Sequence, residues 1–260
     1  MRSARRLLRR KERVAAGQFL AEGRQATAEA LGTPGVVVTL LVADDAVERH
    51  QYLLNVAERA GVPVAAVSAA VLHGLSETVT PQGILAVCRT VDVSLNAALA
   101  GRPRLVVFCE QIRDPGNLGT VIRCADAFGA DAVAVSRESV DLYNAKTVRA
   151  TTGSLFHLPV VVEADLGEVA AYARGLGLQV FGADGGGLCT VDDLRDSGEL
   201  ARPTLWVLGN EAHGFAEGQL ARLDRTVGLQ LYGRAESLNL STAAAVILYA
   251  AATAQRAVLD

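Results

Sequence analysis

Three short polar segments contain the residues best suited to catalysis. They run from Asn117 to Arg123, from Gly209 to Gly214 and from Ser237 to Ser241, and each follows an apolar stretch typical of a buried strand. Arginine, glutamate, serine and asparagine side chains can stabilise developing negative charge, polarise hydroxyl groups and orient a substrate. The three segments therefore predict a site for proton transfer or electrostatic catalysis.

The first segment combines a turn with the start of a helix. Pro-Gly-Asn is turn chemistry, and we expect Asn117 to cap the helix that begins beside it. Gly119 permits close approach of the backbone. Arg123 lies one turn further along among apolar neighbours, so it must find an anionic partner or line a cleft. The alternative is an ordinary surface arginine on an amphipathic helix.

The second segment follows an apolar strand that ends near Leu208. Gly209 would let a ligand pack against the backbone at the strand end, and Glu211 could polarise a neighbour or position an arginine. His213 could serve as a general base, although a single loop histidine is more often a surface or packing residue. Taken alone, this segment could equally be a plain strand-to-helix connection.

The third segment opens a long alanine-rich helix. Ser237 is a candidate N-cap for that helix, which would give it a structural role. Ser237 and Asn239 flank Leu238 at a helix N-terminus, where the partial positive charge favours an anionic or carbonyl group. Both residues are therefore also candidates for ligand binding.

The elements that must position these segments follow an alternating pattern. From Leu105 onward, apolar strands alternate with helices, which predicts an α/β fold with a mostly parallel sheet covered on both faces. Ligands bind such sheets outside the carboxyl ends of the strands. Residues 1–100 read as a smaller α/β unit, and Ala100–Pro103 is the best candidate linker, so we expect domains at 1–100 and 101–260.

Charge is concentrated at the N-terminus of the 260-residue chain. The net charge is −3, yet residues 1–13 hold seven basic side chains and one acid. Arginine presents a planar fork that matches phosphate, so the arm predicts contact with a polyanion, the alternative being a solvated helix. The candidate phosphate contacts are Arg5, Arg9, Arg10 and Arg13.

Several other classes of protein are disfavoured. The four cysteines form no CxxC pair and have no nearby histidine, so we expect no metal site. No apolar run is long enough to span a membrane, and we expect a cytoplasmic protein. The glycine-rich stretch Gly182–Gly187 lacks the GxGxxG spacing of a dinucleotide-binding enzyme, and we interpret it as a loop.

Together the three segments resemble the motifs of the SpoU/TrmH family of RNA 2′-O-ribose methyltransferases, in the SPOUT superfamily. The family patterns Asn-x-Gly-x-x-x-Arg, Gly-x-Glu-x-x-Gly and Ser-Leu-Asn-[Val/Leu]-Ser match residues 117–123, 209–214 and 237–241 in that order. The resemblance covers Arg104 to the C-terminus. Family members often have Ile-Pro-Met where this chain has Leu229-Gln230-Leu231. More loosely, the N-terminal half resembles the RNA-binding domain of rRNA-modifying members.

The resemblance implies a function and a fold. It implies S-adenosylmethionine as cofactor, a ribose 2′-hydroxyl of structured RNA as substrate, a deep trefoil knot in the C-terminal domain and a homodimer. Arg123 would be the central catalytic residue, oriented together with the ribose by Asn117, Glu211, Ser237 and Asn239. The cofactor would contact Leu208, Gly209, Leu229, Leu231 and Leu238.

The sequence leaves more than one hypothesis for the substrate and the activity. The separate N-terminal domain favours 23S ribosomal RNA by analogy, and transfer RNA is the runner-up. A third hypothesis is a non-catalytic RNA-binding protein that kept the fold. It is disfavoured because the chain retains the motif residues Arg123, Glu211, Ser237 and Asn239.

Overall fold

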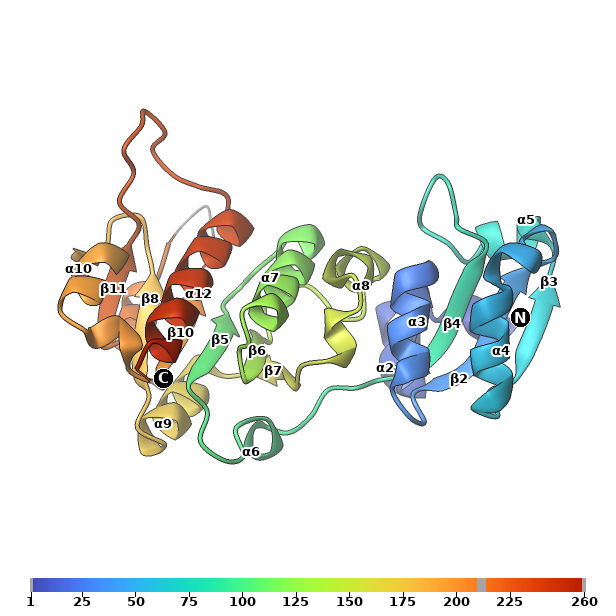
Figure 1. The fold of residues 1–260 in the computed structure, drawn as a ribbon, viewed down its shortest axis with the longest axis horizontal. Helices are drawn as coiled ribbons and strands as arrows, with labels where there is room; N and C mark the ends of the chain where they lie inside the picture. Colours follow the sequence, from blue (N-terminus) through green and yellow to red (C-terminus); the bar gives the residue numbers. More distant parts are fainter. Residues whose placement is uncertain (1, 210–213, 259–260) are drawn as a thin grey trace. The chain divides into compact units, whose positions relative to one another are not determined.

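The computed structural model describes residues 2–209 and 214–258, which form two compact units (Figure 1). Unit 1 comprises Met1–Val91 and Asp141–His157, and unit 2 comprises Asp92–Val140 and Leu158–Asp260. The sequence predicted a single boundary between residues 100 and 101. In the structure, a segment from the middle of the chain also joins unit 1, because its side chains pack and pair with the N-terminal strand and helices.

Unit 1 is built on a four-stranded sheet of order β1-β4-β2-β3. β4 pairs antiparallel with β1 and with β2, whereas β2 and β3 are parallel. The strands are β1 Gln18–Glu22, β2 Val37–Ala43, β3 Val64–Val67 and β4 Ile84–Arg89. The helices are α1 Arg2–Arg6, α2 Arg10–Ala16, α3 Arg24–Gly32, α4 Gln51–Arg59, α5 Ala69–His73 and α8 Ala145–Thr151, with short 3₁₀ turns η1 Asp44–Ala46, η2 Glu48–His50 and η3 Ser154–Phe156.

The basic N-terminal arm folds as two short helices. α1 and α2 are separated at residues 7–9, where Leu7 is buried. α2 ends at Gly17, which adopts a left-handed conformation (φ 58°) that closes the helix. The break is explained by burial, because Ala4 and Leu7 both pack into the core of unit 1.

The segment 141–157 docks on β1 through aromatic and charged contacts. The Phe19 ring lies 4.6 Å from that of Tyr143 and 6.2 Å from that of Phe156, between centroids. The Tyr143 hydroxyl accepts a hydrogen bond of 2.8 Å from the backbone N–H of Val91. Because the Phe19 side chain is fully buried, this segment completes the core of unit 1.

Unit 2 is a seven-stranded sheet of order β7-β6-β5-β10-β8-β11-β9, and all its pairings are parallel. The strands are β5 Leu105–Cys109, β6 Ala132–Ser136, β7 Val160–Ala164, β8 Gln179–Ala183, β9 Cys189–Thr190, β10 Thr204–Leu208 and β11 Arg225–Gly228. The helices are α6 Leu95–Ala98, α7 Pro115–Ala127, α9 Leu166–Gly175, α10 Val191–Asp196, α11 Glu217–Leu220 and α12 Leu240–Arg256, with a 3₁₀ turn η4 at Glu199–Ala201. The prediction of an α/β fold with a largely parallel sheet is confirmed.

The two faces of this sheet are covered by different helices. Apolar residues of β5, β8 and β10 that include Phe108 and Val207 form one core with α6 and α9. α12 packs along α7, and Figure 1 shows these two helices side by side over the sheet. Both carry buried apolar side chains, including Ile122 and Leu248. The trefoil knot that the family resemblance implies stays a prediction.

No helix among the described residues is long and apolar enough to cross a membrane.

Candidate active site

The first and third motif segments, together with Gly209 of the second, lie close together beyond the carboxyl ends of the unit 2 strands. β5 and β10 are neighbours, yet the chain runs from β5 outward to β6 and β7, while β8, β11 and β9 lie on the other side of β10. Strand order therefore reverses between β5 and β10, and such switch points bind ligands outside the strand carboxyl ends. The backbone continues this pairing past the strands, since the N–H of Glu110 donates to the carbonyl of Leu208 (2.9 Å).

The first segment lies on α7, which begins two residues earlier than Asn117. Asp114 is the N-cap, and its Oδ1 accepts from the backbone N–H of Asn117 at 2.9 Å. The expectation that Asn117 caps the helix is therefore wrong, because Pro115 at the first helical position fixes the start. Asn117 lies in the first turn of α7, and Arg123 lies on its exposed face.

The third segment is joined to the first by an amide pair. The Asn239 side chain caps α12, accepting at Oδ1 from the backbone N–H groups of Ser241 (3.0 Å) and Thr242 (3.4 Å). Its Nδ2 donates to Oδ1 of Asn117 at 3.1 Å. Asn239 rather than Ser237 is thus the cap of α12, which leaves the exposed Ser237 hydroxyl outside the helix.

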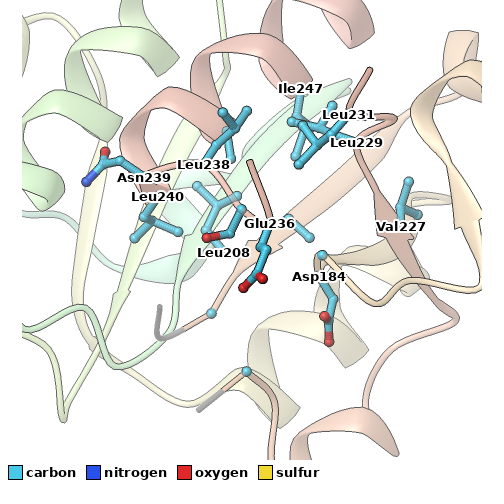
Figure 2. A pocket seen from close by; sticks show the side chains of 16 residues that line it. Asp184, Leu208, Val227, Leu229, Leu231, Glu236, Leu238, Asn239, Leu240 and Ile247 are labelled. Atoms are coloured by element: carbon cyan, nitrogen blue, oxygen red, sulfur yellow. The ribbon is translucent and has the colours of Figure 1, made fainter. Parts of the chain in front are cut away.

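A pocket of about 530 Å³ opens beside this pair (Figure 2). Its volume lies in the range of about 300–1,000 Å³ that small-molecule sites occupy. All five residues that the sequence assigned to the cofactor line it, and so do Ser237 and Asn239. The remaining lining residues are Ala183, Asp184, Gly185, Gly214, Val227, Glu236, Leu240, Ala243 and Ile247.

Gly209 is required by the packing at the carboxyl end of β10. A Cβ atom on Gly209 would lie 2.8 Å from a ring carbon of Phe215, and one on Gly182 in β8 would lie 2.9 Å from the same ring. The buried Phe215 ring therefore lies against two adjacent strands with no space for a side chain between them. This close packing brings the bare backbone of Gly209 to the pocket wall.

Two of the expected cofactor residues lie just beyond β11, which stops at Gly228. Leu229 and Leu231 follow the strand in irregular structure, and both line the pocket.

Two pocket residues were missed by the sequence analysis. Asp184 lies in the glycine-rich stretch interpreted as a loop, and Glu236 immediately precedes Ser237. The only signal for Asp184 was its position directly after a strand. Glu211 and His213 lie outside the described residues.

A buried carboxyl group follows the end of β5. Glu110 follows β5, is 6% exposed and accepts a hydrogen bond of 2.5 Å from Nε2 of Gln219. Burial raises the pKa of Glu110, and the neighbouring carboxylates of Glu138 and Asp165 raise it further, while hydrogen bonding from Gln219 lowers it. Gln219 also accepts from the backbone N–H of Ala216, so it links the end of β5 to the start of α11.

The basic arm divides between solvent and core. Arg5, Arg9 and Arg10 are exposed, whereas Arg13 is 7% exposed and its guanidinium donates to Asp141 (Nε, 3.1 Å) and to the carbonyl of Leu7 (2.8 Å). Arg13 therefore has a structural role, which argues against the predicted phosphate contact.

No cluster of three or more metal-binding side chains occurs in the described part of the chain.

Comparison with known proteins identifies the class. The SpoU rRNA Methylase family matches residues 104–249, and the MRM3-like substrate binding domain matches residues 1–86. The 23S rRNA (guanosine(2553)-2′-O)-methyltransferase RlmP of Bacillus subtilis (strain 168) is 35% identical over 92% of this chain and 90% of its own length. The 23S rRNA (uridine(2479)-2′-O)-methyltransferase of Streptomyces viridochromogenes is 33% identical over 93% and 85%.

Solved structures agree in fold. The SpoU methyltransferase AviRb from Streptomyces viridochromogenes, in complex with the cofactor AdoMet, has a TM-score of 0.84 and 31% identity and covers 99% of this chain and 98% of that chain. A structure concerned with 2-OH methylation of C/U34 on tRNA has a TM-score of 0.51 and 26% identity, and covers 60% of this chain and 99% of that one.

The chain therefore belongs to the SpoU rRNA methylase family. It is an S-adenosylmethionine-dependent RNA 2′-O-methyltransferase.

Proposed function

We propose that this enzyme methylates the ribose 2′-hydroxyl of one nucleotide in 23S ribosomal RNA. The structural observation that carries the assignment to a ribose hydroxyl is the Asn117–Asn239 hydrogen bond, which joins the first and third segments beside the pocket. This bond holds two amide groups beside the cofactor pocket, with Arg123 on the same helix as Asn117. The arrangement suits a polar, hydroxyl-bearing substrate that approaches from solvent.

Ribosomal RNA is favoured over transfer RNA as the substrate because relatives named for 23S rRNA match more of this chain than the structure concerned with tRNA does. Two relatives named as 23S rRNA methyltransferases match both units, over 92% and 93% of this chain. The structure concerned with tRNA methylation is matched almost in full by only 60% of this chain. The additional unit 1 is thus shared with relatives that act on 23S rRNA, which supports the same class of substrate here.

The pocket fits S-adenosylmethionine by its chemistry. Leucine, valine and isoleucine side chains offer an apolar wall for adenine, and the bare Gly209 backbone allows close approach. The carboxylates of Asp184 and Glu236 also line the pocket and could hold a cation. When bound, S-adenosylmethionine supplies an electrophilic methyl group on a sulfonium.

The residues of this chain then align and activate the hydroxyl. We assign Asn117, Asn239 and Ser237 to orienting the ribose, because amide and hydroxyl groups can donate to and accept from ribose oxygens. We assign Arg123 to stabilising the negative charge that develops as the 2′-oxygen loses its proton, because a guanidinium presents several hydrogen-bond donors to an anion. Glu211 belongs to the same proposed set by its motif.

The proposal is tested by methyl transfer from labelled S-adenosylmethionine to 23S rRNA and tRNA that lack the modification. We expect label in 23S rRNA, recovered as a 2′-O-methyl nucleotide after digestion. Label in tRNA alone would keep the enzyme class and overturn the substrate. A base-methylated product would overturn the proposed position of transfer.

We also propose that the enzyme acts as a homodimer through α7 and α12. Tyr249 and Val246 on α12 are 60% and 45% exposed, and the Phe128 ring meets that of Tyr249 edge-on at 5.7 Å. This is an apolar surface on the two helices that bear Arg123 and Asn239. We expect light scattering to give twice the chain mass, and Tyr249→Glu to give the monomer mass; a monomeric wild type would contradict the proposal.

We further propose that the exposed arginines Arg5, Arg9 and Arg10 bind RNA phosphates, which would make affinity fall with salt. We also propose a cytoplasmic location, because the proposed substrate is ribosomal RNA.

A further inference from the structure

The pocket carries negative charge and no balancing cation among its described lining residues. Among the lining residues that the structure describes, only Asp184 and Glu236 carry charge, and the others are apolar, glycine, serine or asparagine. In the view of Figure 2, both carboxylates point away from the apolar end formed by Leu231 and Ile247. A ligand with an apolar end and a cationic end would match this division.

Asp184 is held in place by its own loop. Its Oδ1 accepts from the backbone N–H of Gly186 at 2.9 Å, and its backbone N–H donates to the carbonyl of Val227 at 3.0 Å. The loop is packed tightly on β11, because a Cβ atom on Gly187 would lie 2.5 Å from the backbone nitrogen of Gly228. The carboxylate is therefore pre-organised at the pocket wall, which lowers the entropic cost of binding.

The second oxygen of Asp184 faces the other side of the pocket. Oδ2 lies 3.8 Å from the position that a Cβ atom on Gly214 would occupy, so it reaches across to the end of the second motif segment. Glu236 approaches from the third segment and is exposed. The two carboxylates thus come from β8 and from the approach to α12, and both border the same pocket.

S-adenosylmethionine and its product differ in charge. The sulfonium, ammonium and carboxylate give the substrate a net charge of about +1 at neutral pH, whereas S-adenosylhomocysteine keeps only the ammonium and carboxylate and is neutral overall. During transfer the C–S bond breaks with its electron pair left on sulfur, the 2′-oxygen forms the new bond to carbon, and the hydroxyl proton passes to solvent water. The positive charge therefore disappears from the cofactor at turnover.

We propose that Asp184 and Glu236 make the pocket selective for the cationic cofactor over its neutral product. This inference rests on the proposed function and deepens it. Partial burial of Asp184 strengthens its attraction for the sulfonium end, to which the exposed Glu236 adds, and once the positive charge is lost this attraction falls. The pair consequently favours loading of S-adenosylmethionine and release of the product from one site.

The test is the ratio of dissociation constants for S-adenosylhomocysteine and S-adenosylmethionine, measured by calorimetry on the full chain. Asp184→Asn and Glu236→Gln keep the side-chain shape and remove charge. Asp196→Asn is the matched control, because it makes the same change on α10, outside the pocket lining. We expect the double variant to lower the ratio about tenfold, the size of one lost charge-assisted interaction, and the control to leave it unchanged.

Two further binding measurements test the proposal. Sinefungin, which carries an amine-bearing carbon in place of the methyl sulfonium, should follow S-adenosylmethionine, because charge rather than the methyl group is recognised. Raising salt should weaken binding of the cationic ligands more than that of S-adenosylhomocysteine. An equal loss of affinity for all three ligands, or no loss, would overturn the inference. If the wild-type protein bound none of the three ligands, that result would instead contradict the proposed function.

Discussion

Replacing Arg123 with alanine is expected to lower the rate constant of methyl transfer by about 10²–10³-fold while leaving S-adenosylmethionine affinity within about twofold. The guanidinium is assigned to the charge that develops on the 2′-oxygen, and this charge exists only as the transition state is approached. Removing an interaction made only there reduces kcat rather than binding. The measurement is single-turnover methylation of 23S rRNA beside calorimetric titration of the cofactor.

The position of Arg123 separates catalysis from folding in this test. The side chain is exposed on α7 and is not among the residues that line the pocket, and α7 is buried through other residues such as Leu118 and Ile122. Alanine favours a helix, so the variant should keep its stability. Arg195→Ala is a suitable control, because that arginine is exposed on α10 in the same unit.

Lysine at position 123 distinguishes charge from geometry. Arg123→Lys keeps the positive charge but loses the planar fork of donors, so it should recover only part of the lost rate. An Arg123→Ala variant with wild-type kcat would contradict the assignment. A parallel loss of cofactor affinity would show that the residue supports the pocket instead.

The architecture of unit 2 was predictable because its signals are local. Strands such as Leu105–Cys109 are continuous apolar runs bounded by turn residues, and burial on both faces of a parallel sheet requires such runs. Leu208, Gly209, Leu229 and Leu231 reach the pocket because they end or follow β10 and β11, whereas Leu238 reaches it from the start of α12. Strand order itself was not available from the sequence, since it depends on pairings such as β10 with β5 across about 100 residues.

The errors arise where two local solutions compete or where a partner lies far along the chain. Asp114 and Asn117 could each cap α7, and Ser237 and Asn239 could each cap α12, so the choice depends on packing. The sequence analysis assigned Arg13 to a phosphate contact because its actual partner, Asp141, lies 128 residues further along the chain. The sequence analysis missed Asp184 because its loop matches no known binding motif. Asp184 lies at the pocket only because β8 pairs with both β10 and β11 in the folded sheet.

The second large effect is expected in unit 1, where replacing Arg149 with alanine should lower the free energy of unfolding by about 3–5 kcal/mol. Nη1 of Arg149 donates to Oε2 of Glu22 at 3.0 Å, and the side chain of Glu22 is 5% exposed. The other oxygen accepts from the hydroxyls of Ser76 and Thr78. Without the arginine, a buried carboxylate keeps only neutral donors, which is costly in a low-dielectric environment.

The loss should be measured by chemical denaturation, with hydrogen exchange of β1 and α8 locating the opening. Arg174→Ala is the surface comparison: that arginine pairs with Asp224 at 2.6 Å, with 39% of each side chain exposed, and should cost no more than about 1 kcal/mol. Glu22→Gln combined with Arg149→Met should recover much of the stability, because neither partner is then left charged. A loss for Arg149→Ala no larger than that of the surface pair would contradict the argument.

The same contact decides how the substrate-binding part can be isolated. A fragment of residues 1–100 retains Glu22 and Phe19 but lacks Arg149, Tyr143 and Phe156, so it combines a buried unpaired carboxylate with an uncovered aromatic ring. We expect this fragment to unfold at lower denaturant than unit 1 does in the full chain. Adding residues 141–157 through a flexible linker should restore stability, because that segment, although it follows the first catalytic motif in the sequence, supplies the missing side of the core.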